Sequence, residues 1–103
     1  MKNEAALQTY CNNVLRRLGW LFYHKEKGRT VSKSHSAGFP DLVIFRRGRA
    51  FFIELKTPEG VLSPAQKFWR EDAERNGFLY MVVRTEAEFL IALDEIIRIL
   101  DAR

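Results

Sequence analysis

The sequence predicts an α/β fold in which a mixed β-sheet is flanked by helices, with the element order α-β-β-β-α-β-α. Three observations predict this order: three segments with helical periodicity, short apolar runs of strand length between them, and turn or capping residues at the boundaries. The 103 residues are 47% hydrophobic, which is enough for one ordinary core without metal or disulfide support. We therefore expect one domain that spans residues 1–103.

The first helix is expected over residues 4–18, and Gly19 is placed to end it. The short aromatic run 20–23 then predicts a strand. Residues 24–38 are polar, basic and rich in serine and glycine, so we expect a long loop, a kind of segment that often carries function. The helix is predicted from apolar residues at i, i+3 and i+4 spacing, namely Leu7, Tyr10, Cys11, Val14, Leu15 and Leu18.

A β-hairpin is predicted by two apolar runs, 41–45 and 50–55, which flank a turn at Arg47-Gly48. With these two residues in the turn, Arg46 pairs with Arg49, and the numbers of paired residues sum to 95. Because side chains alternate between the two faces of a sheet, this register turns one set of apolar residues toward the core: Leu42, Ile44, Phe51, Ile53 and Leu55.

Two further helices and one strand follow the hairpin. The segment Ser63-Pro64-Ala65-Gln66 is a capping box that opens a helix ending at Gly77, and its expected buried side chains are Ala65, Phe68, Trp69 and Ala73. The apolar run 78–83 predicts a strand buried on both faces, joined to the hairpin by a right-handed parallel crossover. A second capping box, Thr85 to Glu88, opens the last helix, whose apolar side is expected to hold Phe89, Leu90, Leu93, Ile96, Ile97 and Leu100.

The net charge of +4 is unevenly distributed along the chain. Residues 24–56 hold eight basic and three acidic side chains, whereas residues 57–103 hold six basic and nine acidic ones. A basic centre of this kind indicates either an anion-binding surface, with nucleic acid as the partner, or an ordinary solvated surface rich in lysine. A role at a membrane surface is not expected, because no helix combines a basic face with a bulky apolar one.

Two carboxylates and a lysine share one face of the predicted hairpin. Asp41 lies opposite Glu54 in the register that sums to 95, and Lys56 is two residues beyond Glu54. Like charges directly across a sheet destabilise it unless a cation lies between them. A hard cation such as Mg²⁺ suits two carboxylates and a phosphate ligand. Two interpretations stay open at this point: a metal site, or a cross-strand salt-bridge cluster of the three side chains.

Other kinds of site are not predicted. His24 and His35 are eleven residues apart and have no cysteine or histidine at ligand spacing, which argues against zinc. No phosphate-binding glycine loop or nucleophile elbow is present. Cys11 lies on the apolar side of the first helix, and as the one cysteine it cannot form an internal disulfide, so we expect a reducing compartment. No signal-peptide or membrane-spanning segment is apparent, and we expect a cytoplasmic protein.

The segment Gly38-Phe39-Pro40-Asp41, followed after the hairpin turn by Glu54-Leu55-Lys56, resembles the signature of the PD-(D/E)xK nucleases. The spacing, the strand placement and the segment Leu62 to Gln66 are similar to one branch in particular, the stand-alone VRR-NUC domain. The resemblance extends from Glu4 to about Leu93 and includes the strand that follows Gly77. It implies a restriction-endonuclease-like core.

The resemblance also implies roles for individual residues. Asp41 and Glu54, with the backbone carbonyl of Leu55, would ligate Mg²⁺ or Mn²⁺, and Lys56 would orient or activate the attacking water and stabilise charge in the transition state. Gln66 would assist from beside the site, unless it serves only as a capping residue. Glu4 is similar to an acidic residue that some members place near the metal, or is a first-turn acid favoured by the helix dipole.

Stand-alone members of this size resemble small phage or bacterial nucleases that act as homodimers on branched DNA such as Holliday junctions. We therefore expect a Mg²⁺-dependent, structure-selective DNA endonuclease without an organic cofactor or a membrane partner. The alternatives are a flap, nicking or restriction-type nuclease on the same fold, or a catalytically silent DNA-binding module. Contacts to DNA phosphates are expected from Lys25, Lys27, Arg29, Lys33, His35, Arg46, Arg47 and Arg49.

Overall fold

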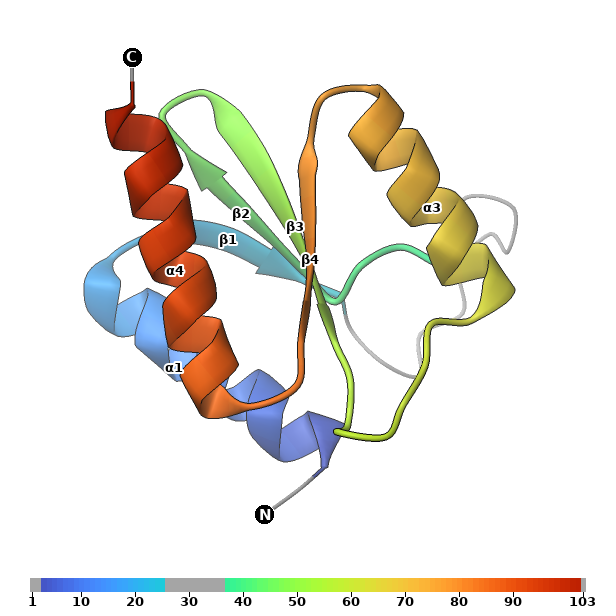
Figure 1. Ribbon diagram of the computed structural model, residues 1–103. Helices are drawn as coiled ribbons and strands as arrows, with labels where there is room; N and C mark the ends of the chain where they lie inside the picture. Colours follow the sequence, from blue (N-terminus) through green and yellow to red (C-terminus); the bar gives the residue numbers. More distant parts are fainter. Residues whose placement is uncertain (1–2, 26–36, 103) are drawn as a thin grey trace.

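A computed structural model describes residues 3–25 and 37–102 (Figure 1). These residues form a four-stranded sheet in the order β1-β2-β3-β4, in which β1 pairs with β2 and β2 with β3 antiparallel, and β3 with β4 parallel. The predicted element order α-β-β-β-α-β-α is confirmed. The elements are α1 (Glu4–Leu18), β1 (Leu21–His24), β2 (Leu42–Arg46), β3 (Arg49–Leu55), α3 (Pro64–Arg75), β4 (Leu79–Val83) and α4 (Glu86–Asp101).

The β2–β3 hairpin has the predicted register, with strand ends that differ by one residue from the predicted runs. Arg46 pairs with Arg49, and Leu42 pairs with Ile53 at the other end of the ladder. Both turn residues have positive φ, 49° at Arg47 and 77° at Gly48. Two consecutive left-handed residues define the type I′ turn, whose twist matches that of the flanking strands. A two-residue turn therefore fixes which side chains of the two strands face each other.

The helices cover the two faces of the sheet unequally (Figure 1). One face packs against α1 and α4. The hairpin side chains predicted to face the core lie on this face: Leu42, Ile44, Phe51, Ile53 and Leu55. Cys11 of α1 is fully buried in this layer, and burial, reinforced by the charge of Glu86, raises the pKa of its thiol to about 12. The other face packs against α3 through a smaller cluster made by Val43, Phe52, Ala73 and Tyr80.

The predicted caps are present, with one difference at α4. Gly19 ends α1 in the left-handed conformation, with φ of 73°. Ser63 and Gln66 form both hydrogen bonds of a capping box at the start of α3. At α4 the hydroxyl of Thr85 accepts the bond from the Glu88 amide, but the Glu88 carboxylate accepts its bond from the amide of Arg84. The second predicted capping box is therefore half formed.

Several side chains predicted to be buried are exposed. Phe68 is 65% exposed, because α3 rests on the sheet through Trp69 and Ala73 and turns Phe68 to the side. Leu90 and Ile97 are also exposed, because the core-facing stripe of α4 is narrower than the apolar pattern suggests. Strand β4 is covered on both faces, as predicted, but not completely. Tyr80 is buried on the α3 face and Val83 on the α1–α4 face, whereas Leu79, Met81 and Val82 are half-buried, since the strand lies at the edge of the sheet.

Candidate active site

Two buried carboxylates lie where the hairpin strands reach the end of the sheet opposite the turn. Asp41 directly precedes β2 and Glu54 is the last residue but one of β3, so the ladder places them across from each other. Asp41 is 7% exposed and Glu54 is 2% exposed. Asp41 Oδ2 accepts a hydrogen bond of 2.8 Å from the Leu55 amide, which ties the first carboxylate to the second strand.

The approach of Asp41 to β3 depends on the glycine three residues earlier. Gly38 has a φ of 80°, and a Cβ at this position would lie 2.3 Å from the backbone oxygen of Ala65. The segment before Asp41 therefore rests directly on the first turn of α3, at a distance that no side chain allows. This contact brings the α3 N-terminus to the same end of the sheet as the carboxylates.

Glu54 is held by side chains from α3 and β4. Gln66 Nε2 donates a hydrogen bond of 2.8 Å to Glu54 Oε2, while Gln66 Oε1 accepts one of 2.8 Å from the Ser63 amide. The capping role of Gln66 is confirmed, and the same side chain also contacts Glu54, so the two interpretations do not exclude each other. The hydroxyl of Tyr80 donates a longer bond of 3.4 Å to Glu54 Oε1.

Tyr80 was missed in the sequence because its contact depends on the parallel pairing of β3 and β4. In that pairing Glu54 lies level with Val82, and Tyr80 lies two residues earlier on the same face. Burial, with the nearby charge of Glu54, raises the pKa of the Tyr80 hydroxyl, so it remains a donor at neutral pH.

The surroundings of Glu54 favour its protonated form. Burial, followed by the hydrogen bond and charge of Asp41, raises the pKa of Glu54 to about 8, although Lys56 and Lys25 act in the opposite direction. Among residues 3–25 and 37–102, no lysine or arginine forms an ion pair with either carboxylate. The described residues therefore do not form the cross-strand salt-bridge cluster that was the alternative interpretation of the sequence.

The donor set fits a hard divalent cation. Two carboxylates in close proximity supply the charged oxygen ligands that Mg²⁺ and Mn²⁺ prefer, and a buried acidic pair is stabilised by a cation. In the described part of the chain no group of three or more histidine, cysteine, aspartate or glutamate side chains is placed to hold a metal ion, so the two carboxylates would be the side-chain ligands. Asp41, Glu54 and the Leu55 carbonyl would leave the remaining coordination positions to water and substrate oxygens.

Two lysines flank the carboxylate pair. Lys56 directly follows β3, is half-buried, and donates its backbone N–H to Val83 O at 3.0 Å. Lys25 directly follows β1, and its Nζ donates a bond of 2.8 Å to Phe39 O, in the segment before Asp41. Both lower the pKa of Glu54, so both ammonium groups act on the site electrostatically.

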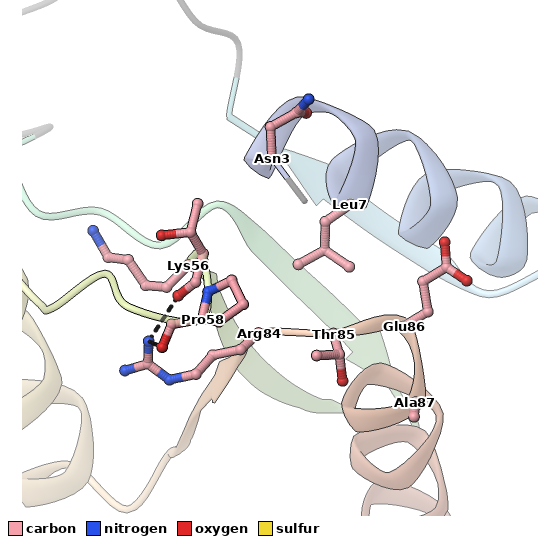
Figure 2. A pocket seen from close by; sticks show the side chains of 9 residues that line it. Asn3, Leu7, Lys56, Pro58, Arg84, Thr85, Glu86 and Ala87 are labelled. Carbon is pink, nitrogen blue, oxygen red and sulfur yellow. Dashed lines mark hydrogen bonds between the residues drawn. The ribbon is translucent and has the colours of Figure 1, made fainter. Parts of the chain in front are cut away.

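A cavity of about 330 Å³ opens beside Lys56 (Figure 2). Its wall includes Asn3, the N-cap of α1, and Thr85, the N-cap of α4. Together with the α3 N-terminus at Gln66, three helix N-termini therefore lie at the carboxylate end of the sheet, where their dipoles favour a phosphate. Glu4 follows Asn3 in the first turn of α1 and is half-buried, so its helix reaches the site region, but it does not line the cavity.

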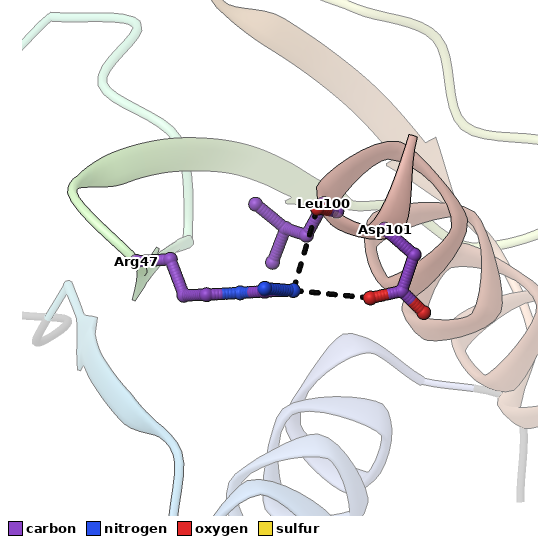
Figure 3. Close-up of polar contacts among 3 residues, drawn as sticks. All are labelled: Arg47, Leu100 and Asp101. Carbon is purple, nitrogen blue, oxygen red and sulfur yellow. Dashed lines mark hydrogen bonds and ion pairs between the residues drawn. The ribbon is translucent and has the colours of Figure 1, made fainter. Parts of the chain in front are cut away.

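The hairpin-tip arginines lie at the opposite end of the sheet. Five residues of extended strand, about 16 Å, separate Asp41 from Arg46. Arg47 donates hydrogen bonds to Leu100 O and to Asp101 Oδ1, the latter at 3.0 Å, and so ties the turn to the end of α4 (Figure 3). Arg46 stacks on Trp20 and Arg49 on Phe51. The other predicted DNA contacts, Lys27, Arg29, Lys33 and His35, lie outside the described residues.

The mixed sheet, the helices on both faces and the acidic pair with its lysine define a restriction-endonuclease-like fold of the PD-(D/E)xK type. The family profile of the VRR-NUC domain matches residues 3–87, and the chain belongs to this family of nuclease-type domains that act on DNA. The VRR-NUC domain expected from the sequence is thus confirmed.

Solved structures are similar over nearly the whole chain. One described as a "VRR_NUC domain" superposes with a TM-score of 0.71 at 24% identity, and covers 91% of this chain and 97% of its own. Another, a "VRR_NUC domain protein", superposes with a TM-score of 0.77 at 21% identity, and covers 95% and 92%. These identities support the fold alone. A search of curated proteins gives no significant match, and no described helix is long and apolar enough to cross a membrane.

Proposed function

We propose that this nuclease domain is a Mg²⁺-dependent DNA endonuclease whose catalytic residues are Asp41, Glu54 and Lys56. The observation that carries the proposal is the buried pair of carboxylates, which forms no ion pair with a described lysine or arginine, at a sheet end where three helix N-termini meet. Mn²⁺ is expected to replace Mg²⁺, since both accept carboxylate, carbonyl and water oxygens.

Each residue has a distinct task in the proposed hydrolysis. Asp41 and Glu54, with Leu55 O, would hold the metal ion, which when bound polarises a phosphoryl oxygen and acidifies water. The Lys56 ammonium would orient the attacking water and stabilise the negative charge that develops on the phosphate. Gln66 and Tyr80 keep the Glu54 carboxylate in one orientation through their hydrogen bonds.

The proposed substrate is branched DNA, and in particular a four-way junction. Contacts to phosphates position a nuclease without reading sequence, and Lys25 lies near enough to the site to make one. Arg46, Arg47 and Arg49 would contact only DNA that extends about 16 Å along the sheet from the cut. One site cuts one strand, so symmetric resolution of a two-fold junction requires a homodimer.

The test is cleavage by the purified protein of labelled four-way junction, flap and linear duplex, each with Mg²⁺, Mn²⁺ or a chelator. We expect metal-dependent cleavage with preference for the junction, loss of cleavage in Asp41→Asn, and a slow but measurable residual rate in Lys56→Ala. Preference for the flap or the linear duplex would favour a flap, nicking or restriction-type nuclease. Binding without cleavage by the wild type would mean a DNA-binding module instead.

A further inference from the structure

Arg84 organises the turn that follows Lys56. Its Nη1 donates hydrogen bonds to three backbone carbonyls, those of Thr57 at 2.8 Å, Pro58 at 3.3 Å and Gly60 at 2.6 Å. Figure 2 shows the guanidinium directed at the turn, with the bonds to Thr57 and Pro58 drawn. One cationic group thus joins the residue after β4 to the segment after β3, across a sequence separation of 24 to 27 residues.

The turn of residues 57–60 begins directly after Lys56. The Gly60 amide donates a hydrogen bond of 3.0 Å to Thr57 O, and the Lys56 amide donates one of 3.0 Å to Val83 O, the residue before Arg84. A Cβ added at Gly60 would lie 3.5 Å from Lys56 Cδ, so the turn passes beside the aliphatic part of the lysine side chain with room for about one methyl group between them. The position of this side chain therefore depends on the shape of the turn.

We propose that Arg84 is a positioning residue for Lys56. This inference rests on the proposed function, because it assigns Arg84 to the lysine that would act on the attacking water. Held by Arg84, the turn stays beside the Lys56 stem and restricts the region that the ammonium reaches. An arginine suits this task because its guanidinium is always charged and presents several N–H donors in one plane, whereas a lysine presents a single compact group.

The contacts of Nη1 favour this role over direct binding of DNA, and a double-mutant cycle separates the two, because Arg84 also lines the cavity beside Lys56. Arg84 Nη1 is committed to three carbonyls, and none of its hydrogen bonds reaches Asp41 or Glu54. A group that acts on catalysis only through Lys56 has no effect once Lys56 is removed. A group that binds a phosphate retains its effect on affinity.

The experiment is a double-mutant cycle on single-turnover cleavage at saturating DNA, with Arg84→Ala, Lys56→Ala and the double variant. We expect Arg84→Ala to slow cleavage about 100-fold, the scale of a misplacement near 1 Å, with DNA affinity in chelator changed less than about twofold. The double variant is expected to be no slower than Lys56→Ala. Arg98→Ala, which removes an exposed arginine paired with Glu95, is the matched control and is expected to cleave normally.

A second readout does not require activity. The rate at which an acylating reagent modifies the Lys56 amine, followed by mass spectrometry, should rise in Arg84→Ala and in Arg84→Lys but not in Arg98→Ala. Arg84→Lys keeps the charge and serves where the alanine variant fails to fold.

Three results would overturn the inference: wild-type cleavage by Arg84→Ala, an additive loss in the Lys56→Ala background, or unchanged Lys56 labelling. A weaker DNA affinity in step with the rate would instead make Arg84 a phosphate ligand. Failure of the wild type to cleave would refute the proposed function, while the labelling would still decide the role of Arg84.

Discussion

Gly38 and Ala65 touch backbone to backbone, and this contact connects the segment before Asp41 to the helix that carries Gln66. A Cβ at Gly38 would lie 2.3 Å from Ala65 O and 3.0 Å from the Gln66 amide nitrogen. The position of Asp41 relative to Gln66 is therefore set by a glycine that takes no part in the chemistry.

Gly38→Ala is expected to destabilise the protein by about 3 kcal/mol, since it combines an unfavourable φ with a backbone overlap. Gly48→Ala is the matched control, because Gly48 also has positive φ but has no atom within 4 Å of its would-be Cβ. It should cost only about 1 kcal/mol. Denaturant midpoints measure both, and equal losses would contradict the proposed contact.

The metal-free protein is expected to lose stability as the pH rises from about 4.5 to about 8. Folded Glu54 keeps its proton up to a pKa of about 8, whereas the unfolded chain releases it near 4.5, so folding takes up a proton in this interval. The contribution is complete below the unfolded pKa and disappears as the pH passes the folded one. In chelator, Glu54→Gln should show a flatter stability profile and exceed the wild type at pH 8. A parallel profile for the two proteins would refute this.

Mg²⁺ and Mn²⁺ are expected to raise the Tm of the wild type. At an ion concentration 100 times Kd the stabilisation is about 2.7 kcal/mol. Because binding requires ionised carboxylates, the ion displaces the Glu54 proton, and affinity should increase with pH up to about 8. Asp41→Asn should abolish the shift in Tm, while Asp101→Asn, at the exposed end of α4, should keep it. An equal shift in both variants would place the ion elsewhere.

Tyr80→Phe is expected to slow cleavage about fivefold, the equivalent of one hydrogen bond of about 1 kcal/mol, through looser placement of Glu54. Tyr23→Phe is the control, since Tyr23 is 53% exposed and its ring packs against Phe39. Single-turnover rates at saturating DNA measure the effect. A rate for Tyr80→Phe equal to that of the control would show that Glu54 is placed without Tyr80.

That Asp41 lies opposite Glu54 could be predicted from the sequence, because a two-residue turn determines the pairing register of the whole hairpin. Once Arg47 and Gly48 are assigned to the turn, every cross-strand pair follows by counting, and side-chain alternation gives the faces. The cap at Ser63 and the end of α1 at Gly19 are equally local, and both are confirmed.

The contacts of Tyr80, Arg84 and Arg47 could not be predicted in this way. The parallel strands β3 and β4 are joined through α3 and not by a tight turn, so nothing local places Tyr80 beside Glu54. Arg47 was assigned to DNA on its charge alone. Its partner Asp101 is 54 residues away in the sequence, and the two residues meet only because α4 ends beside the hairpin turn.

The length of the hairpin turn determines whether Asp41 and Glu54 face each other at the opposite end of the strands. Side chains alternate between the faces, so one residue added at Arg47-Gly48 would either slip the ladder or bulge it, and a slip would turn Glu54 away from Asp41. The chemistry at one end of the strands thus depends on the length of a loop about 16 Å away. For this chain the number of residues in that loop is a stricter requirement than their charge, and a single-residue insertion there would act on catalysis without touching DNA or metal.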